Sequence, residues 1–370
     1  MLVIGTISHL LSYFIAYHII IIISPSAIEQ YEPAVTWATP VKAFTECKFG
    51  NFTIPDVARQ RMEKAGIDLS RGYPAYPPDL VYKQDVAALQ PGPVEFSDPG
   101  LRADKEKKAL FGAAKEVRHL TYHCGTEIVG LQLKDLTSQQ KDELAFLVSE
   151  RGVVFFRDQD LSPQQQRDVT AHFGPVFVSS KRDLVHLPQT FGIIHLHYDT
   201  VLPHGGDILW ASGYAAYCKI SPDFRKFIDG KKAVMRPGDS YLDRDDATTG
   251  RQPVEEIHPI VRVHPVTGWK CLFVNRPWAL RIIGLEKAES NMVLQYLFNA
   301  YENTIDIQCR WRWALGTSAL WDNRCTLHNA SWDYENRVTR HGTRVATVAE
   351  KPYFDANAPA IREALGLEDE

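Results

Sequence analysis

The stretch WDNRCTLHNASWDYENRVTRHGTR, residues 321–344, carries the most specific pattern in the chain. It places one histidine, His328, on an extended run and two arginines, Arg340 and Arg344, on the next run. Side chains alternate between the two faces of a strand, so residues four apart point the same way. We therefore expect both guanidinium groups on one face. The alternative is a surface strand pair with a solvated histidine and exposed arginines.

These residue types suit a metal ion and a carboxylate. A neutral imidazole can bind divalent iron, which also needs a second histidine, a carboxylate and open positions for a co-substrate and oxygen. An arginine fork gives a carboxylate two parallel, charge-assisted hydrogen bonds. His328 is therefore a candidate iron ligand, and Arg340 or Arg344 is a candidate carboxylate clamp.

The same stretch resembles the C-terminal signature of the taurine dioxygenase (TauD/TfdA) family of iron(II)- and 2-oxoglutarate-dependent dioxygenases, particularly its fungal members. Similar stretches run through most of the chain from Tyr122 onward. They are GTEIVGLQLKDLTSQQKDELAFLVSERGVVFFRDQDLS (125–162), GGDILWASGYAAY (205–217) and HPIVRVHPVTGWKCLFVN (258–275).

The resemblance implies an α+β, mainly β fold, in which a double-stranded β-helix, or jelly roll, is flanked by helices. It implies that His328 is the distal iron ligand and that Arg340 binds a carboxylate of 2-oxoglutarate. Arg344 would then face the acidic group of the substrate. Fe(II) is the implied cofactor, and 2-oxoglutarate is the implied co-substrate.

The function that the resemblance implies is hydroxylation of a small acidic substrate by O2, with release of succinate and CO2. Taurine or another alkyl sulfonate is the substrate class that fits. A net charge of -4 and the absence of a basic stripe argue against nucleic acid as a partner. Association into a homo-oligomer is left open.

The larger of two departures from the family pattern concerns the remaining iron ligands. Family members carry them in a Trp-His-x-Asp segment well upstream of the Gly-Gly-Asp turn. The matching pair here, His197 and Asp199, lies only eight residues before Asp207. The run 191–197 is similar to the strand that normally follows that segment. We therefore expect the jelly roll to lack one family segment.

Two accounts of His197 and Asp199 follow. In the first, their spacing puts both side chains on one strand face, from which they chelate iron together with His328. In the second, they are polar residues of a strand that leads to a turn, and the short connection favours this account. The alternative function is then a catalytically inactive jelly-roll protein that binds a small acid.

The second departure is Ile208, which stands where family members usually carry the threonine of Gly-Gly-Asp-Thr. That hydroxyl helps to hold the 2-oxoglutarate carboxylate. Isoleucine has no donor, so one hydrogen bond to a charged group, worth about 1.5 to 3 kcal/mol, would be lost. Binding would then depend on the arginine.

The composition, 45% hydrophobic and 23% charged over 370 residues, is ordinary for a globular protein. Residues 2–24 contain no Asp, Glu, Lys or Arg, and this uncharged segment is long enough to anchor an otherwise cytoplasmic protein to a membrane. The alternative is that the start of the protein is mispredicted. The six scattered cysteines are expected to be reduced thiols. We expect an apolar segment (1–25), an irregular Pro- and charge-rich arm (26–118), a dioxygenase domain (119–356) and a C-terminal tail (357–370).

Local signals predict individual elements as well. The expected helices are residues 55–65, one opened by a Thr137–Gln140 capping box, two opened by Ser162-Pro163 and Ser221-Pro222, and 287–301. The expected β-hairpin pairs residues 259–263 with 271–275.

Overall fold

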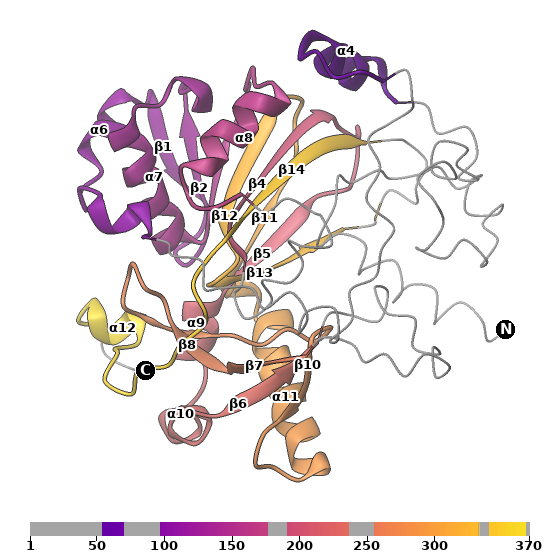
Figure 1. The fold of residues 1–370 in the computed structure, drawn as a ribbon. Coiled ribbons are helices and arrows are strands. Elements are labelled where there is room, and N and C mark those ends of the chain that lie inside the picture. Colours follow the sequence, from indigo (N-terminus) through magenta and orange to yellow (C-terminus); the bar gives the residue numbers. More distant parts are fainter. Residues whose placement is uncertain are drawn as a thin grey trace, which may run out of the picture.

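Two β-sheets that share one core form the centre of the molecule (Figure 1). The computed structural model describes residues 54–69, 97–176, 191–236, 255–331, 333 and 340–367. The larger sheet has the order β1-β2-β3-β12-β4-β14, with β1 (Glu116–His119), β2 (Thr126–Val129), β3 (Val153–Phe156), β12 (Thr317–Asp322), β4 (Phe191–Thr200) and β14 (His341–Val348). The smaller sheet has the order β11-β5-β13, with β11 (Gln308–Trp311), β5 (Ile208–Ser212) and β13 (Thr326–Ala330).

The inner faces of the two sheets enclose a core that is rich in aromatic residues. The larger sheet contributes Val153, Phe155, Ile194, Leu196, Tyr198, Ala319, Trp321 and Ala346, and the smaller contributes Ile208, Trp210, Cys309, Trp311 and Ala330. The inward residues of each strand are spaced by two, as the pleat requires. Two sheets closed on a shared interior are the arrangement of a jelly roll, as expected.

Helices cover the outer face of the larger sheet. They are α6 (Lys108–Ala113), α7 (Ser138–Arg151) and α8 (Pro163–Ala171), whose apolar residues form a second core with Val154, Phe156, Ile193 and Leu320. The predicted capping box of α7 is confirmed, since Thr137 Oγ1 accepts from the Gln140 amide and Gln140 Oε1 accepts from the Thr137 amide. Helix α6 falls in the range predicted as an irregular arm, and its Leu110 is buried in this second core.

Helix α4 (Asp56–Lys64) is the described part of the N-terminal arm that precedes residue 97, and it matches the helix predicted there. It contacts β4 and buries Ala58 and Met62. No helix among the described residues is long and apolar enough to cross a membrane. The apolar segment 1–25 lies outside these residues.

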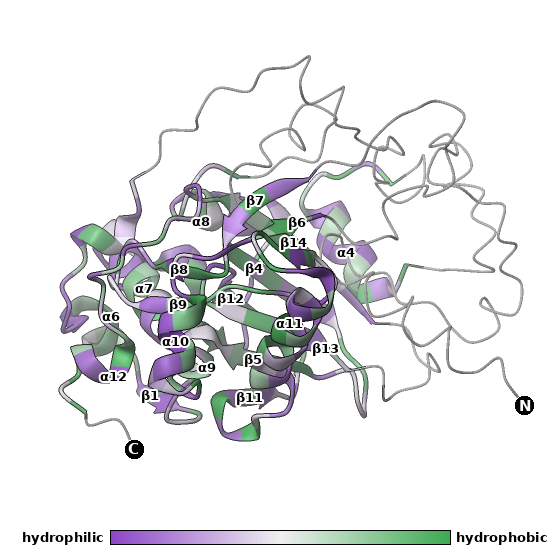
Figure 2. Ribbon diagram, turned by 90° about the horizontal axis from the view of Figure 1, so that it is seen from below, coloured by the Kyte–Doolittle hydropathy of each residue, from purple (hydrophilic) through white to green (hydrophobic). Residues whose placement is uncertain are grey.

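A third sheet, with the order β10-β6-β7, lies below the jelly roll in Figure 1, together with α10 and α11. Helix α11 carries both hydrophobic and hydrophilic residues along its length (Figure 2), and its buried residues include the predicted stripe. The elements here are β6 (Lys232–Met235), β7 (Glu256–Pro259), β10 (Ala279–Ile282), α9 (Gly213–Cys218), α10 (Pro222–Ile228), α11 (Lys287–Glu302), the confirmed hairpin β8 (Val261–Val263) and β9 (Lys270–Leu272), and α12 (Ile361–Ala364).

The gap expected in the family pattern falls in residues 177–190, which lie outside the described residues. Strand β4, which follows, lies in the middle of the larger sheet, between β12 and β14. Among the described residues, β13 pairs with β5 alone, and β14 pairs with β4 and through one isolated bridge between Val176 and Thr347. None of the five cysteines in the described ranges is in a disulfide.

Candidate active site

Strand β13 carries His328 on the inner face of the smaller sheet. The residue stands opposite Trp210 of β5 in the register, and its ring centroid lies 4.9 Å from the ring of Trp321. Burial, and to a lesser extent the charge of Arg344, lowers the pKa of His328 to about 3. The imidazole is therefore neutral at physiological pH and keeps a lone pair for a metal ion.

Arg344 lies in β14 and Arg340 directly precedes this strand, and both side chains reach the same interior. The Arg344 Cζ atom lies 6.0 Å from the centre of the Trp321 ring, and the Arg340 Cζ atom lies 5.4 Å from that of Tyr198. Both rings belong to the core between the sheets, so both arginines face it, as their spacing predicts. Trp321 contacts His328 as well as Arg344, and it therefore joins the two.

The Gly-Gly-Asp turn before β5 is bonded to Arg340, whose Nη1 donates to the carbonyl of Gly206. Gly205 and Gly206 both have φ of 70°, a conformation that favours glycine. Asp333 supports the turn, because its Oδ1 accepts from the Gly206 amide at 2.8 Å and its Oδ2 accepts from Arg310 at 2.9 Å. The turn and the Arg340 guanidinium are thus one bonded unit.

A narrow cavity of about 10 Å³ lies beside this unit, which is room for about one water molecule. Its lining consists of Tyr198, Val201, Leu202, Gly205, Gly206, Trp313 and Arg340. The rings of Tyr198 and Trp313 pack edge to face with centroids 4.5 Å apart. Ile208, which stands where the family pattern is expected to carry a threonine, is buried in the core between the two sheets and does not line this cavity.

His197 and Asp199 lie on the outer face of β4, together with Ile193 of the helix-covered core. Asp199 accepts from His341 Nδ1 at 2.6 Å through Oδ1 and from Arg61 of α4 at 3.0 Å through Oδ2. His197 Nδ1 is 2.9 Å from the hydroxyl of Ser318. Burial is the main reason why the pKa of His197 falls to about 2. The structure therefore brings this pair together with Arg61, not with His328.

In the described ranges, the group of three candidate ligand atoms within 4.8 Å of one another is that of His264, Asp322 and Cys325. His197, Asp199 and His328 do not form such a group. Asp322 is already bonded, since it accepts from His264 at 2.9 Å and from Arg324 at 2.6 Å.

Burial acts to raise the pKa of Asp322, but the charges of Arg324 and His264 outweigh it and lower that pKa below its usual range. Asp98 and Glu350 pair with the same Arg324 guanidinium, at 2.7 and 3.2 Å. The aspartate and arginine of the WDNR stretch therefore form a buried ion network that supports the strand leading to His328.

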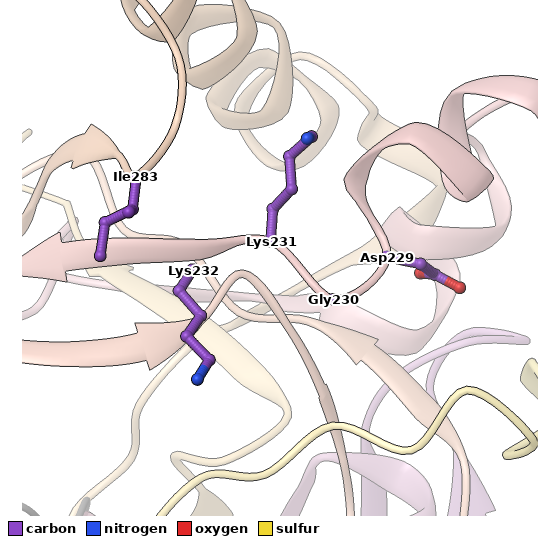
Figure 3. A pocket seen from close by; sticks show the side chains of 5 residues that line it. All are labelled: Asp229, Gly230, Lys231, Lys232 and Ile283. Carbon is purple, nitrogen blue, oxygen red and sulfur yellow. The ribbon is translucent and has the colours of Figure 1, made fainter.

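A hollow of about 440 Å³ lies away from these residues, at the third sheet (Figure 3). Asp229, Gly230, Lys231, Lys232 and Ile283 line it. The two lysine side chains point in opposite directions (Figure 3), and Asp229 is paired with Lys270 at 2.8 Å. No candidate site residue lines this hollow.

Sequence reasoning did not identify Tyr198, Trp313 and Trp321 as parts of the site. A signal for Tyr198 was present, because it lies between His197 and Asp199 and must point to the opposite face of the same strand. Trp313 follows β11 in the chain and reaches the cavity only through the packing of the two sheets.

Comparison with known proteins agrees with this architecture. The model of the "Taurine catabolism dioxygenase TauD, TfdA family" matches residues 116–183 and 179–346. An alpha-ketoglutarate-dependent dioxygenase of Penicillium expansum is 33% identical over 325 residues, which cover 75% of this chain and 90% of that protein. An alpha-ketoglutarate-dependent sulfonate dioxygenase of Saccharomyces cerevisiae is 33% identical over 314 residues, which cover 71% of this chain and 76% of that protein.

Solved structures are similar as well. The crystal structure of a taurine dioxygenase from Burkholderia xenovorans matches with a TM-score of 0.57 and 26% identity, over 65% of this chain and 92% of that one. These similarities lend no support to the catalytically inactive alternative, since the relatives are named as dioxygenases. The chain belongs to the TauD/TfdA family of 2-oxoglutarate-dependent dioxygenases.

Proposed function

We propose that this chain hydroxylates a small acidic substrate, with an alkyl sulfonate such as taurine as the first candidate. The observation that carries the proposal is the placement of one neutral histidine and two arginines around one aromatic interior. Each arginine suits one acidic group, and a dioxygenase that acts on a sulfonate binds two acids, the sulfonate and 2-oxoglutarate. The sulfonate dioxygenase among the relatives supports the substrate class.

The two arginines have separate surroundings and are assigned separate roles. Arg340, bonded to the Gly206 carbonyl beside the narrow cavity, binds the distal carboxylate of 2-oxoglutarate. Arg344 shares the Trp321 ring with His328 and binds the acidic group of the substrate. Buried aromatic walls exclude water, which strengthens both charge-assisted interactions.

His328 fits one position of an iron site, because a neutral imidazole in a buried setting is a good ligand for Fe(II). The described residues place no other two ligands around it, so they do not complete the site. His197 and Asp199 are the sequence-based candidates, and their bonds on the outer face favour the structural account. Bound iron and 2-oxoglutarate would supply the oxidising chemistry, which yields succinate and CO2.

An anaerobic titration tests the iron site. Fe(II) is added in the presence of 2-oxoglutarate while the weak visible charge-transfer band of that chelate is followed. We expect a saturable band that His328→Ala removes and that His123→Ala, a change to a partly exposed histidine elsewhere, leaves in place. Folded protein without a band would overturn the proposal for this chain.

Succinate formation tests the substrate class. We expect taurine or another short alkyl sulfonate to stimulate succinate release, and we expect an uncharged alcohol of equal length to fail. Arg344→Met should raise the KM for the sulfonate more than the KM for 2-oxoglutarate. An equal loss for both compounds would contradict the separate roles of the two arginines.

A further inference from the structure

Two buried hydrogen-bond donors at the narrow cavity have no partner among the described residues. They are the hydroxyl of Tyr198 and the indole N–H of Trp313, whose side chains are 1% and 9% exposed. Nearly all buried polar groups in proteins are hydrogen-bonded, so an unsatisfied pair points to a missing acceptor. Both side chains line the cavity together with Arg340.

The chemistry of this lining selects an anion. A phenol hydroxyl such as that of Tyr198 can donate a hydrogen bond. An indole N–H only donates, and a guanidinium is positively charged and only donates. Three donors without an acceptor side chain suit a carboxylate, which accepts through both oxygens.

The position of Ile208 explains why such donors are needed. The family pattern has a threonine hydroxyl there, and Ile208 has none. Its side chain is buried in the same core as Tyr198 and Trp313. A carboxylate at Arg340 would therefore lack one neutral donor unless another side chain supplies it.

We propose that Tyr198 and Trp313 donate hydrogen bonds to the distal carboxylate of 2-oxoglutarate beside Arg340, in place of the hydroxyl that Ile208 lacks. This inference rests on the proposed function, in which Arg340 holds that carboxylate. The cavity has room for about one water molecule, so a carboxylate enters only if the lining moves apart.

Calorimetric titration tests the inference without turnover. The full-length protein is loaded with Mn(II) in place of iron, and 2-oxoglutarate is titrated into it. Glutarate, which keeps the distal carboxylate and lacks the keto group, is the second probe. We expect Tyr198→Phe and Trp313→Phe each to weaken binding of 2-oxoglutarate about tenfold, with a similar loss for glutarate.

Trp311→Phe is the matched control. Trp311 also has a buried indole N–H without a partner among the described residues, in the same core, but it does not line the cavity. This variant should bind 2-oxoglutarate as the parent protein does. If Tyr198→Phe and Trp313→Phe bind like Trp311→Phe, the two donors are satisfied by water and the inference fails.

A further variant, Arg340→Met, separates this failure from that of the proposed function. If Arg340→Met binds 2-oxoglutarate normally, the site itself is misplaced and the proposed function fails. If Arg340→Met loses binding while the two donor variants keep it, only the inference fails. Thermal unfolding of each variant shows whether it is folded.

Discussion

The polar side chains on the two faces of β4 differ in whether they are hydrogen-bonded. On the outer face, both carboxylate oxygens of Asp199 are bonded, to His341 and to Arg61. On the inner face, one residue away, the hydroxyl of Tyr198 has no partner in the described part of the chain. A polar cluster that satisfies itself holds the protein together, whereas an unsatisfied one beside a cation is arranged for a ligand. The hydrogen-bond partners of a polar side chain therefore distinguish a structural site from a functional one better than its residue type does.

A substitution at Asp199, on the outer face of β4, should have the strongest effect, a loss of stability. Asp199→Ala should lower the free energy of unfolding by about 3 kcal/mol, because it removes the buried carboxylate that pairs with Arg61 at 3.0 Å and accepts from His341. Urea unfolding measures this loss. Asp223→Ala is the control, since Asp223 pairs with Lys226 at the surface. If Asp199→Ala is stable and instead abolishes iron binding, the metal-ligand account of Asp199 is right.

The inner face should respond in binding rather than in stability. Arg340→Met is expected to weaken binding of 2-oxoglutarate about a hundredfold, because a bidentate, charge-assisted interaction is lost. Titration calorimetry gives the affinity, and Arg118→Met, at an exposed position on β1, serves as the control. Unchanged affinity would contradict the proposal that this face binds 2-oxoglutarate.

A third buried polar group, His258 on β7, should make the stability of the protein depend on pH. Its ring Nδ1 has no partner among the described residues. Burial, helped by Arg262, lowers the pKa of His258 to about 4, below the value near 6.5 of an unfolded chain. The unfolded state then binds more protons between these pH values, so stability falls on acidification. We expect His258→Phe to remove about 1.4 kcal/mol of the loss between pH 7.5 and 5.5 in urea unfolding. The exposed His204→Phe should leave the slope as it is.

The smallest effect is expected at Arg310, which bridges Asp207 and Asp333 from an exposed position. Exposed ion pairs contribute about 0.5 kcal/mol, so Arg310→Ala should shift the midpoint of thermal unfolding only slightly. Affinity for 2-oxoglutarate should stay within a factor of two, because Asp333 still accepts from the Gly206 amide. A tenfold loss of affinity would show that the Gly-Gly-Asp turn depends on this surface pair.

Elements with local causes were predictable from the sequence. The capping box at Thr137, the proline that opens α8 and the apolar stripe of α11 all depend on neighbours within one or two turns. The strand position of His328 and the shared face of the arginines also follow from a period of two. Helix α6 was not predicted, because its burial depends on contacts with the distant α7.

For the candidate site, the residue pattern alone predicted the chemistry: one histidine, two arginines on one strand face, and an isoleucine in place of a hydroxyl donor. Which face of β4 points inward followed from the packing of the folded chain, which brings Asp199 to Arg61 and Tyr198 to Arg340. The reason is physical. Because side chains alternate along a strand, neighbouring residues must point to opposite faces of the sheet. Which of the two faces becomes the interior depends on where the second sheet and the helices pack.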